Sequence, residues 1–329
     1  MSGKILIETE HLEVATGDGW ALPLTRVFAP ERLDPSRSPV LIVPGYGMNS
    51  HALRYHQTGR GMKRAIAEAG REVWTIDLRD HGASRRIQRK ARGSSLRAYA
   101  TEDVPAGVAG VLRHTHSDAD RLALVGVSLG GALSYSYLAA NPDAPVGAMV
   151  AMSSPLRWDR IHPVLRAAFF SRRLAGWVPV AGARPLARAA LPTVGRLTPL
   201  LNPYINAQRV RIGSVWELVR SVETPPRRIN REMAAWIKRK HLEIDGVRIE
   251  RGLGKVRIPL LVVIANRDGI VPKETVLSVL DVWGGEHTVL KVGDDKVRYG
   301  HADPYVAPDA HDRVFVPICR WLDGESGLG

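Results

Sequence analysis

Runs of apolar residues alternate with amphipathic helical patterns along most of the chain. The apolar runs predict strands at 11–16, 25–30, 40–44, 72–76, 121–127, 147–153, 258–266 and 287–293. Helical periodicity predicts helices at 61–70, at 99–114, from 129 to about 140, from Pro272 onward and at 309–322. Because strands alternate with helices, we expect an α/β fold with a mostly parallel sheet covered by helices on both faces.

The alternation is interrupted between the strands at 147–153 and 258–266. Residues 225–242 predict a helix that begins at prolines, with Ile229, Met233, Trp236 and Ile237 on one face. Residues 214–223 open with Ser214 and Glu217 at capping-box spacing, and prolines and glycines divide 176–203 into short pieces. We therefore predict a core of residues 1–151 and 256–329 that carries an inserted helical cap, residues 152–255.

Charge separates the predicted cap from the core. The formal net charge is +13, and the whole excess lies in 152–255, because the rest of the chain holds equal numbers of basic and acidic residues. A second basic cluster follows the strand at 72–76 and consists of Arg85, Arg86, Arg89, Lys90, Arg92 and Arg97. The cap also contains the apolar residues Leu165, Phe169, Phe170, Trp177, Leu186, Leu191, Leu200 and Leu201.

An apolar and basic rim suits an acyl ester presented at an anionic membrane surface, or an acyl chain on an anionic carrier. The alternative is that the arginines simply cover a solvated face. Nucleic acid is not an expected partner, since the tryptophans have core-like helical spacing and no nucleic-acid motif is present.

Length and composition indicate a globular protein that can bury a large core. The chain has 329 residues and one cysteine, Cys319, which has no partner for an internal disulfide and is expected in a buried helix face. The first residues lack the pattern of a signal peptide, and no apolar run is long enough for a membrane span. We expect a cytoplasmic protein, with peripheral membrane association left open.

Small residues surround one serine where a predicted strand meets a predicted helix. Gly126, Ser128 and Gly130 form the pattern Gly-x-Ser-x-Gly in the segment LALVGVSLGGALSY. Glycines two residues before and after the serine allow a sharp turn that exposes the hydroxyl as a nucleophile. A serine that merely caps a helix would not need Gly126.

A serine nucleophile needs a base that is itself oriented by an acid, and on such a turn the chain order is serine, acid, histidine. Asp268 follows the strand 258–266, and His301 lies between the last predicted strand and the last predicted helix. The backbone N–H groups of Tyr46, after the strand 40–44, and of Leu129, at the helix start, are the predicted oxyanion donors.

Four blocks carry a resemblance to the α/β-hydrolase superfamily, and most of all to its capped esterase and lipase-type members. They are VLIVPGYGMNS, VWTIDLRDHGAS, LVGVSLGGA, and VVIANRDGIVP with YGHADP. The likeness covers about 10–150 and 256–325. Pro44 stands where the family usually has histidine, and Asp80 where it usually has glycine. Related dehalogenases and epoxide hydrolases use an aspartate at position 128, and polyester synthases a cysteine, so the serine disfavours both.

The resemblance implies an α/β-hydrolase sheet with an inserted cap, a triad of Ser128, Asp268 and His301, and no metal or organic cofactor. The implied activity is cleavage of carboxylic esters with a lipophilic acyl group. Thioester, amide or lactone hydrolysis, acyl transfer to an alcohol or amine, and non-catalytic ligand binding on the same scaffold remain open.

Other titratable residues offer weaker sites. His287, His311, Asp295 and Asp303 are alternative triad members in less suitable places. The segment 114–120 contains His114, His116, Asp118 and Asp120 at a spacing reminiscent of metallohydrolases, but solvated residues at a helix end explain it better. Asp77, Arg79 and His81 are expected to form structural ion pairs and turn bonds, with His81 also able to reach the mouth of the pocket.

Overall fold

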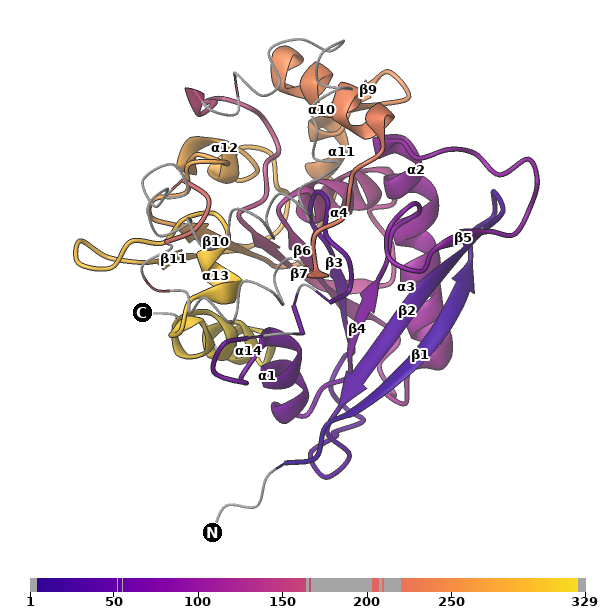
Figure 1. Cartoon of the computed structure of the whole chain (residues 1–329), viewed down its shortest axis with the longest axis vertical. Helices are drawn as coiled ribbons and strands as arrows, with labels where there is room; N and C mark the ends of the chain where they lie inside the picture. Colours follow the sequence, from indigo (N-terminus) through magenta and orange to yellow (C-terminus); the bar gives the residue numbers. More distant parts are fainter. Residues whose placement is uncertain are drawn as a thin grey trace.

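The computed structural model describes residues 5–51, 53–54, 56–163, 166, 203–206, 209 and 220–324, and a single large sheet organises them (Figure 1). Its strands are β1 (Glu8–Ala15), β2 (Trp20–Phe28), β3 (Val40–Val43), β4 (Val73–Ile76), β5 (Arg85–Arg86), β6 (Leu122–Val127), β7 (Val146–Met152), β10 (Leu260–Ala265) and β11 (His287–Val292). Their order is β1-β2-β4-β3-β6-β7-β10-β11, and β5 pairs with β2 off this path.

The sheet is parallel from β4 to β11, while β1, β2 and β5 are antiparallel. Every residue of β3, β6 and β10 is buried, which explains why these strands are continuous apolar runs in the sequence. The edge strand β1 is different, because most of its side chains face solvent, including Glu8, Glu10 and Glu13. The structure thus confirms the predicted mostly parallel sheet.

Helices cover both faces of the sheet. One face packs against α3 (Val104–His114), α4 (Leu129–Ala140), α11 (Glu250–Leu253) and α12 (Lys273–Leu277). The other packs against α1 (Met62–Glu68), α13 (Asp303–Val306) and α14 (Val316–Leu322), as the two groups in Figure 1 show. Cys319 lies buried in α14, as predicted.

Two of the predicted helices contain a π-helical turn that the sequence pattern did not predict. The helix at 99–114 follows the short α2 (Leu96–Ala98) and begins with a π-turn at Tyr99–Asp103, and the one at 309–322 contains a π-turn at His311–Phe315. A proline follows each π-turn: Pro105 in the first turn of α3, and Pro317 in the first turn of α14. Proline has no N–H to donate and crowds the carbonyl four residues earlier, so the preceding turn widens.

The described part of the insertion contains α10 (Arg227–Arg239) and the short strands β8 (Glu243–Ile244) and β9 (Val247–Arg248). The four residues predicted for the apolar face of α10, Ile229, Met233, Trp236 and Ile237, are all buried. Ser214, Glu217 and the apolar residues Leu165, Phe169, Phe170, Trp177, Leu186, Leu191, Leu200 and Leu201 lie outside the described residues. The boundaries of the cap at 152 and 255 therefore stay a prediction.

None of the helices in the described ranges combines the length and the apolar character that crossing a membrane requires.

Candidate active site

Ser128 occupies a strained turn between β6 and α4. Its φ is 51° and its ψ is −116°, a region that residues with a side chain rarely adopt. The turn is possible only because its neighbours lack side chains. A Cβ on Gly126 would lie 2.3 Å from the Gly131 Cα, and one on Gly130 would lie 2.1 Å from the Val43 carbonyl oxygen. The strain lifts Ser128 above the carboxyl ends of the strands, where it is half-buried.

His301 joins Ser128 to Asp268. The His301 Nε2 lies 3.0 Å from the Ser128 Oγ, and the His301 Nδ1 lies 2.7 Å from the Asp268 Oδ2. The side chains of His301 and Asp268 are 6% and 2% exposed, so little water competes for this contact. The sequence placed these residues on three separate strand ends, and the fold brings them within hydrogen-bond distance.

The Asp268 carboxylate is held in place from its other side. Its Oδ1 accepts the backbone N–H groups of Ile270 at 2.9 Å and Val271 at 2.8 Å. Both carboxylate oxygens are therefore used, one by the turn and one by the imidazole. A carboxylate fixed in this way can orient the histidine ring and stabilise its charged form.

Asp303 organises the turn that carries His301. Its Oδ2 accepts the N–H of Gly300 at 2.5 Å and that of Asn206 at 2.9 Å. Burial raises the pKa of Asp303 to about 6. Residues 203–206 pack over this turn, since Ala302 donates its N–H to the Tyr204 carbonyl at 2.7 Å, and the ring of Tyr204 lies 6.1 Å from that of His301. Asp303 thus supports the turn and does not contact the imidazole itself in the described bonds.

The loop that follows β3, residues 44–51 and hereafter the β3 loop, lies against Ser128. A Cβ on Gly45 would be 3.3 Å from the Ser128 Cβ. Tyr46 comes next in the chain and donates its hydroxyl to the Asn230 Oδ1 of α10, while burial raises the Tyr46 pKa well above its usual value. Leu129 is the first residue of α4. Leu129 follows Ser128 directly in the chain, and Tyr46 follows Gly45, which packs against Ser128. The role of both residues as oxyanion donors stays a prediction.

A buried lysine and a buried aspartate hold the far end of the β3 loop. The backbone N–H of Ser50 donates to the Asp77 Oδ1 at 2.5 Å, and the backbone carbonyl of Ser50 accepts from the Lys63 Nζ at 2.5 Å. Lys63 is only 2% exposed, and burial lowers its pKa to about 7. Burial also raises the pKa of Asp77. This pair fixes the loop and was not foreseen as such from the sequence.

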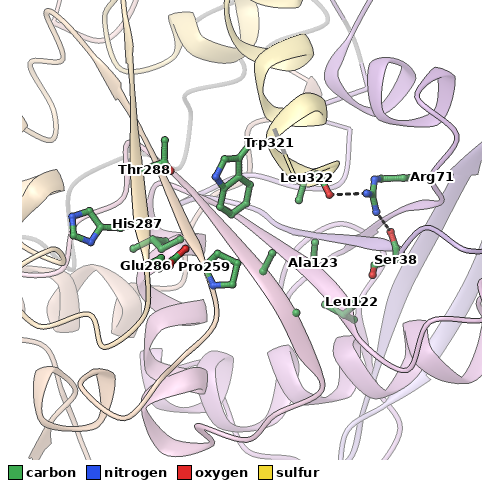
Figure 2. Close-up of a pocket in the computed structure, with 14 residues that line it drawn as sticks. Ser38, Arg71, Leu122, Ala123, Pro259, Glu286, His287, Thr288, Trp321 and Leu322 are labelled. Atoms are coloured by element: carbon green, nitrogen blue, oxygen red, sulfur yellow. Dashed lines mark hydrogen bonds between the residues drawn. The ribbon is translucent and has the colours of Figure 1, made fainter. Parts of the chain in front are cut away.

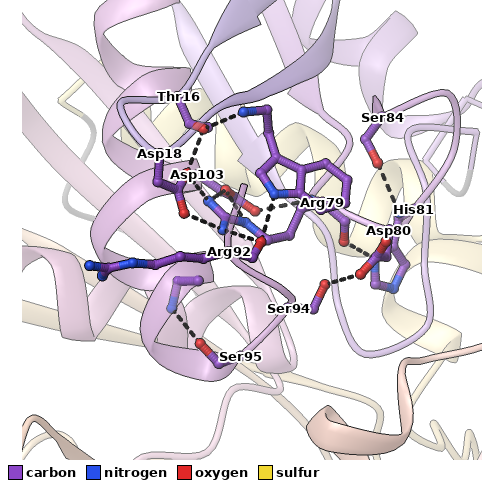
Figure 3. Close-up of polar contacts among 12 residues, drawn as sticks. Thr16, Asp18, Arg79, Asp80, His81, Ser84, Arg92, Ser94, Ser95 and Asp103 are labelled. Atoms are coloured by element: carbon purple, nitrogen blue, oxygen red, sulfur yellow. Dashed lines mark hydrogen bonds and ion pairs between the residues drawn. The ribbon is translucent and has the colours of Figure 1, made fainter. Parts of the chain in front are cut away.

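Arg79 forms the structural ion pairs that were expected after β4 (Figure 3). Its side chain is fully buried and bonds Asp18 at 2.6 Å and Asp103 at 2.7 Å. Hydrogen bonds hold the following turn as well, since the His81 N–H reaches the Ser84 Oγ at 3.1 Å. His81 is buried and its Nδ1 lies 3.1 Å from the carbonyl of Arg79, so its described contacts are structural.

Asp80, which replaces the glycine usual in the resembled family, has a φ of 60°. Its side chain accepts a hydrogen bond from Ser94 and so ties the β4 turn to the basic segment that follows. This gives the unusual aspartate a structural explanation.

The remaining candidates lie apart from Ser128. His287 begins β11 at the amino end of the strands, His311 contacts Arg60, and Asp295 lies in the exposed loop after β11. In segment 114–120, the Nδ1 of His116 contacts the buried Arg26 at 2.8 Å. Among the described residues, no group of three or more His, Cys, Asp or Glu side chains is arranged to hold a metal ion.

Figure 2 shows a cavity of about 380 Å³ at the amino ends of the parallel strands. Ser128 lies at the other end of the strands, where β6 meets α4. Pro259, His287, Trp321 and Leu322 are among the residues that line it. Since these residues lie at the amino ends of the parallel strands or at the end of α14, the cavity is separate from the serine site.

Two residues of the site region come from the insertion and were missed in the sequence. Glu223 accepts a hydrogen bond from the Asn49 Nδ2 at 2.6 Å, and Asn230 accepts one from Tyr46. A signal for Asn230 existed, because an asparagine lies on the buried stripe of an otherwise apolar helix face. No local pattern distinguishes Glu223.

A family model of the α/β hydrolase fold matches residues 38–295. No curated protein matches the chain in sequence.

Among solved structures, an esterase from Rhodococcus sp. is 17% identical with a TM-score of 0.62, covering 97% of this chain and 99% of that one. A carboxylesterase from Bacillus subtilis is 16% identical with a TM-score of 0.57, covering 97% and 93%. A 2-hydroxy-6-oxo-6-phenylhexa-2,4-dienoate hydrolase from Rhodococcus sp. is 17% identical with a TM-score of 0.60, covering 97% and 100%. Likeness at this identity concerns the fold alone.

Proposed function

Since the chain belongs to the α/β-hydrolase fold family, we propose that it is a serine hydrolase that cleaves carboxylic esters through an acyl-enzyme. The observation that carries the proposal is the chain of contacts from the Asp268 Oδ2 through His301 to the Ser128 Oγ, at 2.7 and 3.0 Å. These distances are those of hydrogen bonds, and the order of acid, base and hydroxyl is the one that activates a serine.

In the proposed reaction, the Ser128 Oγ attacks the ester carbonyl carbon as its proton passes to the His301 Nε2. Asp268 stabilises the imidazolium through Nδ1–H. The backbone N–H groups of Tyr46 and Leu129 donate to the oxyanion, and each such donor typically contributes 10²–10³ in rate. Collapse of the intermediate breaks the ester C–O bond, and the leaving alcohol takes the proton from His301. Water, deprotonated by His301, then releases the acid and restores Ser128.

The proposed substrate has a lipophilic acyl group. Support comes from the apolar residues in the sequence of the insertion, such as Phe169 and Trp177, because lipophilic ligands are bound mainly by apolar and aromatic side chains. An ester series of increasing acyl length tests this. Turnover should rise with acyl length in the wild type, and Trp177→Ala should reduce that rise. A flat series would contradict the acyl preference without touching the nucleophile.

Labelling with a fluorophosphonate, followed by ester hydrolysis, tests the nucleophile. Wild type should be labelled and should hydrolyse a p-nitrophenyl ester, whereas Ser128→Ala should lose the label and at least about 10⁴-fold in kcat. Equal labelling of both proteins would exclude Ser128. Absence of both labelling and turnover in the wild type would favour ligand binding without catalysis, and ester products formed with an added alcohol would favour acyl transfer.

We also propose peripheral association with an anionic membrane surface through the basic segment at 85–92. Ile87 is 45% exposed there, and Arg89 and Lys90 beside it are exposed. Each basic residue near such a surface contributes about 1 kcal/mol, and a single apolar side chain adds to this. The protein should sediment with phosphatidylglycerol vesicles at low salt and not with phosphatidylcholine vesicles. Arg89→Glu with Lys90→Glu should abolish sedimentation, and equal binding to both vesicles would contradict the proposal.

A further inference from the structure

A short segment of the insertion, residues 220–225 and hereafter the strap, runs beside the β3 loop. The two are joined by backbone bonds of the kind found between strands. Met48 and Val222 form an antiparallel bridge, the Asn49 N–H reaches the Ser221 carbonyl at 3.1 Å, and the Glu223 N–H reaches the Gly47 carbonyl at 2.7 Å. The loop therefore has a β partner that comes from the insertion and not from the central sheet.

Side chains add a second set of contacts between the same segments. The Glu223 Oε1 accepts from the Asn49 Nδ2 at 2.6 Å and from the Gly82 N–H at 3.3 Å, so one carboxylate joins the strap, the β3 loop and the turn after β4. Gly47 has a φ of 63°, and a Cβ there would lie 3.1 Å from the Glu223 carbonyl oxygen. The positive φ, together with this close approach, favours glycine at 47.

The helix that follows the strap holds the side chain of Tyr46. Asn230 lies in the first turns of α10, is buried, and accepts the Tyr46 hydroxyl hydrogen bond. The β3 loop is thus attached to the insertion at both ends of the segment 46–49. A buried hydrogen bond of this kind fixes a side chain, because moving it away would leave a buried polar group unpaired, with its desolvation penalty uncompensated.

These contacts bear on one peptide group. Met48, which the strap holds by its bridge to Val222, donates its N–H to the Gly45 carbonyl at 3.2 Å. The C=O and N–H of a trans peptide point in opposite directions, so the same bond sets the direction of the Tyr46 N–H. A Cβ on Gly45 would lie 3.3 Å from the Ser128 Cβ, so this N–H belongs to a peptide that follows directly on a residue packed against the nucleophile.

We propose that the strap and α10 position the oxyanion-hole loop, with Glu223 and Asn230 as positioning residues, an inference that rests on the proposed function. In this proposal, the insertion helps to form the oxyanion hole. Any movement of its described part relative to the sheet changes the direction of an oxyanion donor and therefore the rate of acyl transfer to Ser128.

Kinetics of matched variants test the proposal. Glu223→Ala removes the acceptor shared by Asn49 and Gly82, and Asn230→Leu removes the partner of Tyr46 at similar volume. Each should lower kcat about 10-fold or more with KM changed less than about threefold, since losing an oxyanion donor entirely typically costs 10²–10³. Glu223→Gln, which keeps an acceptor oxygen, should retain most of the kcat.

A control on the same helix separates positioning from general damage. Arg228→Ala breaks the exposed ion pair with Glu232, which does not touch the β3 loop, and should leave kcat and KM within about twofold. The pH dependence of kcat should keep its shape in every variant, because the contact between Asp268 and His301 is untouched. Should Asn230→Leu fail to fold, Tyr46→Phe removes only the hydroxyl and should lower kcat about threefold in the same direction.

The outcomes separate the two proposals. Wild-type kcat in Glu223→Ala and Tyr46→Phe, together with an inactive Ser128→Ala, would overturn the positioning role and leave the serine hydrolase intact. A rise in KM at constant kcat would overturn it as well, because that pattern signals lost substrate binding. Turnover that persists in Ser128→Ala would refute the proposed function and this inference with it.

Discussion

Replacing Lys63 by methionine should make stability less dependent on pH between pH 8 and pH 10. Lys63 is 2% exposed and burial lowers its pKa to about 7, from about 10.4 for an unfolded chain. Desolvation is the largest cause of this shift. The charge of Asp77 raises the pKa of Lys63 and the charge of Arg54 lowers it, both by less than desolvation does. Between those two pKa values, the unfolded chain holds a proton at this position and the folded protein does not.

The sign and size of the effect follow from this difference. The unfolding free energy rises with pH wherever the unfolded state binds more protons, by up to about 1.4 kcal/mol per pH unit for one group. Relative to Lys63→Met, the wild type should therefore gain about 2.5 kcal/mol between pH 8 and pH 10. The penalty of burying the charged amine is fully present below about pH 7 and is relieved as the pH rises. Loss of the bond to the Ser50 carbonyl lowers the stability of the variant by an amount that does not depend on pH in this window.

Urea unfolding at pH 8, 9 and 10 measures the difference. Lys255→Met is the matched control, because Lys255 is exposed and its replacement should leave the pH dependence parallel to that of the wild type. The reasoning is refuted if the curves of wild type and Lys63→Met run parallel within about 0.5 kcal/mol, since the buried amine would then keep an ordinary pKa.

Two pairs of substitutions test the packing around a glycine and the hydrogen bond of a buried indole. Gly130→Ala should lower the unfolding free energy by at least about 2 kcal/mol and Tm by roughly 4 °C, because the new Cβ would lie 2.1 Å from the Val43 carbonyl oxygen. Gly17→Ala is the control and should change Tm little, because the nearest atom to its new Cβ would be 3.8 Å away. In urea unfolding, Trp20→Phe should destabilise the protein about 1–2 kcal/mol more than Trp236→Phe does. The Trp20 indole N–H donates to a backbone carbonyl at 2.8 Å, whereas the indole N–H of Trp236 is buried without a partner among the described contacts. Equal effects of the two replacements, or a Gly130→Ala protein as stable as the wild type, would contradict these accounts.

The parts of the fold that the sequence predicted are those with a strong local pattern. Continuous apolar runs predicted the buried parallel strands, and the glycines around Ser128 predicted its turn, because a strained backbone restricts which residues can stand beside it. Asp268 and His301 could be proposed because in such a sheet the carboxyl ends of the strands gather at one edge. Their contact with Ser128 then depended only on strand order.

The parts that were missed depend on how distant segments pack. No local sequence pattern predicts the role of Glu223, because its partners Asn49 and Gly82 lie far away in the chain. Only the tertiary fold brings them together. Lys63 lies on a short amphipathic helix, where a lysine normally faces solvent, and its burial follows from contact with the β3 loop. Local patterns carry no information on such contacts.

The glutamates of β1 lie along an exposed edge of the central sheet. An edge strand exposes unpaired backbone groups that can recruit a strand from another molecule, and inserted charges oppose such pairing. In β1, Glu8, Glu10 and Glu13 are exposed along that edge, and Glu10 and Glu13 form ion pairs with Arg26 and Arg85 of the same molecule. A strand arriving at this edge would have to accommodate these charged side chains, which disfavours edge-to-edge pairing of two copies.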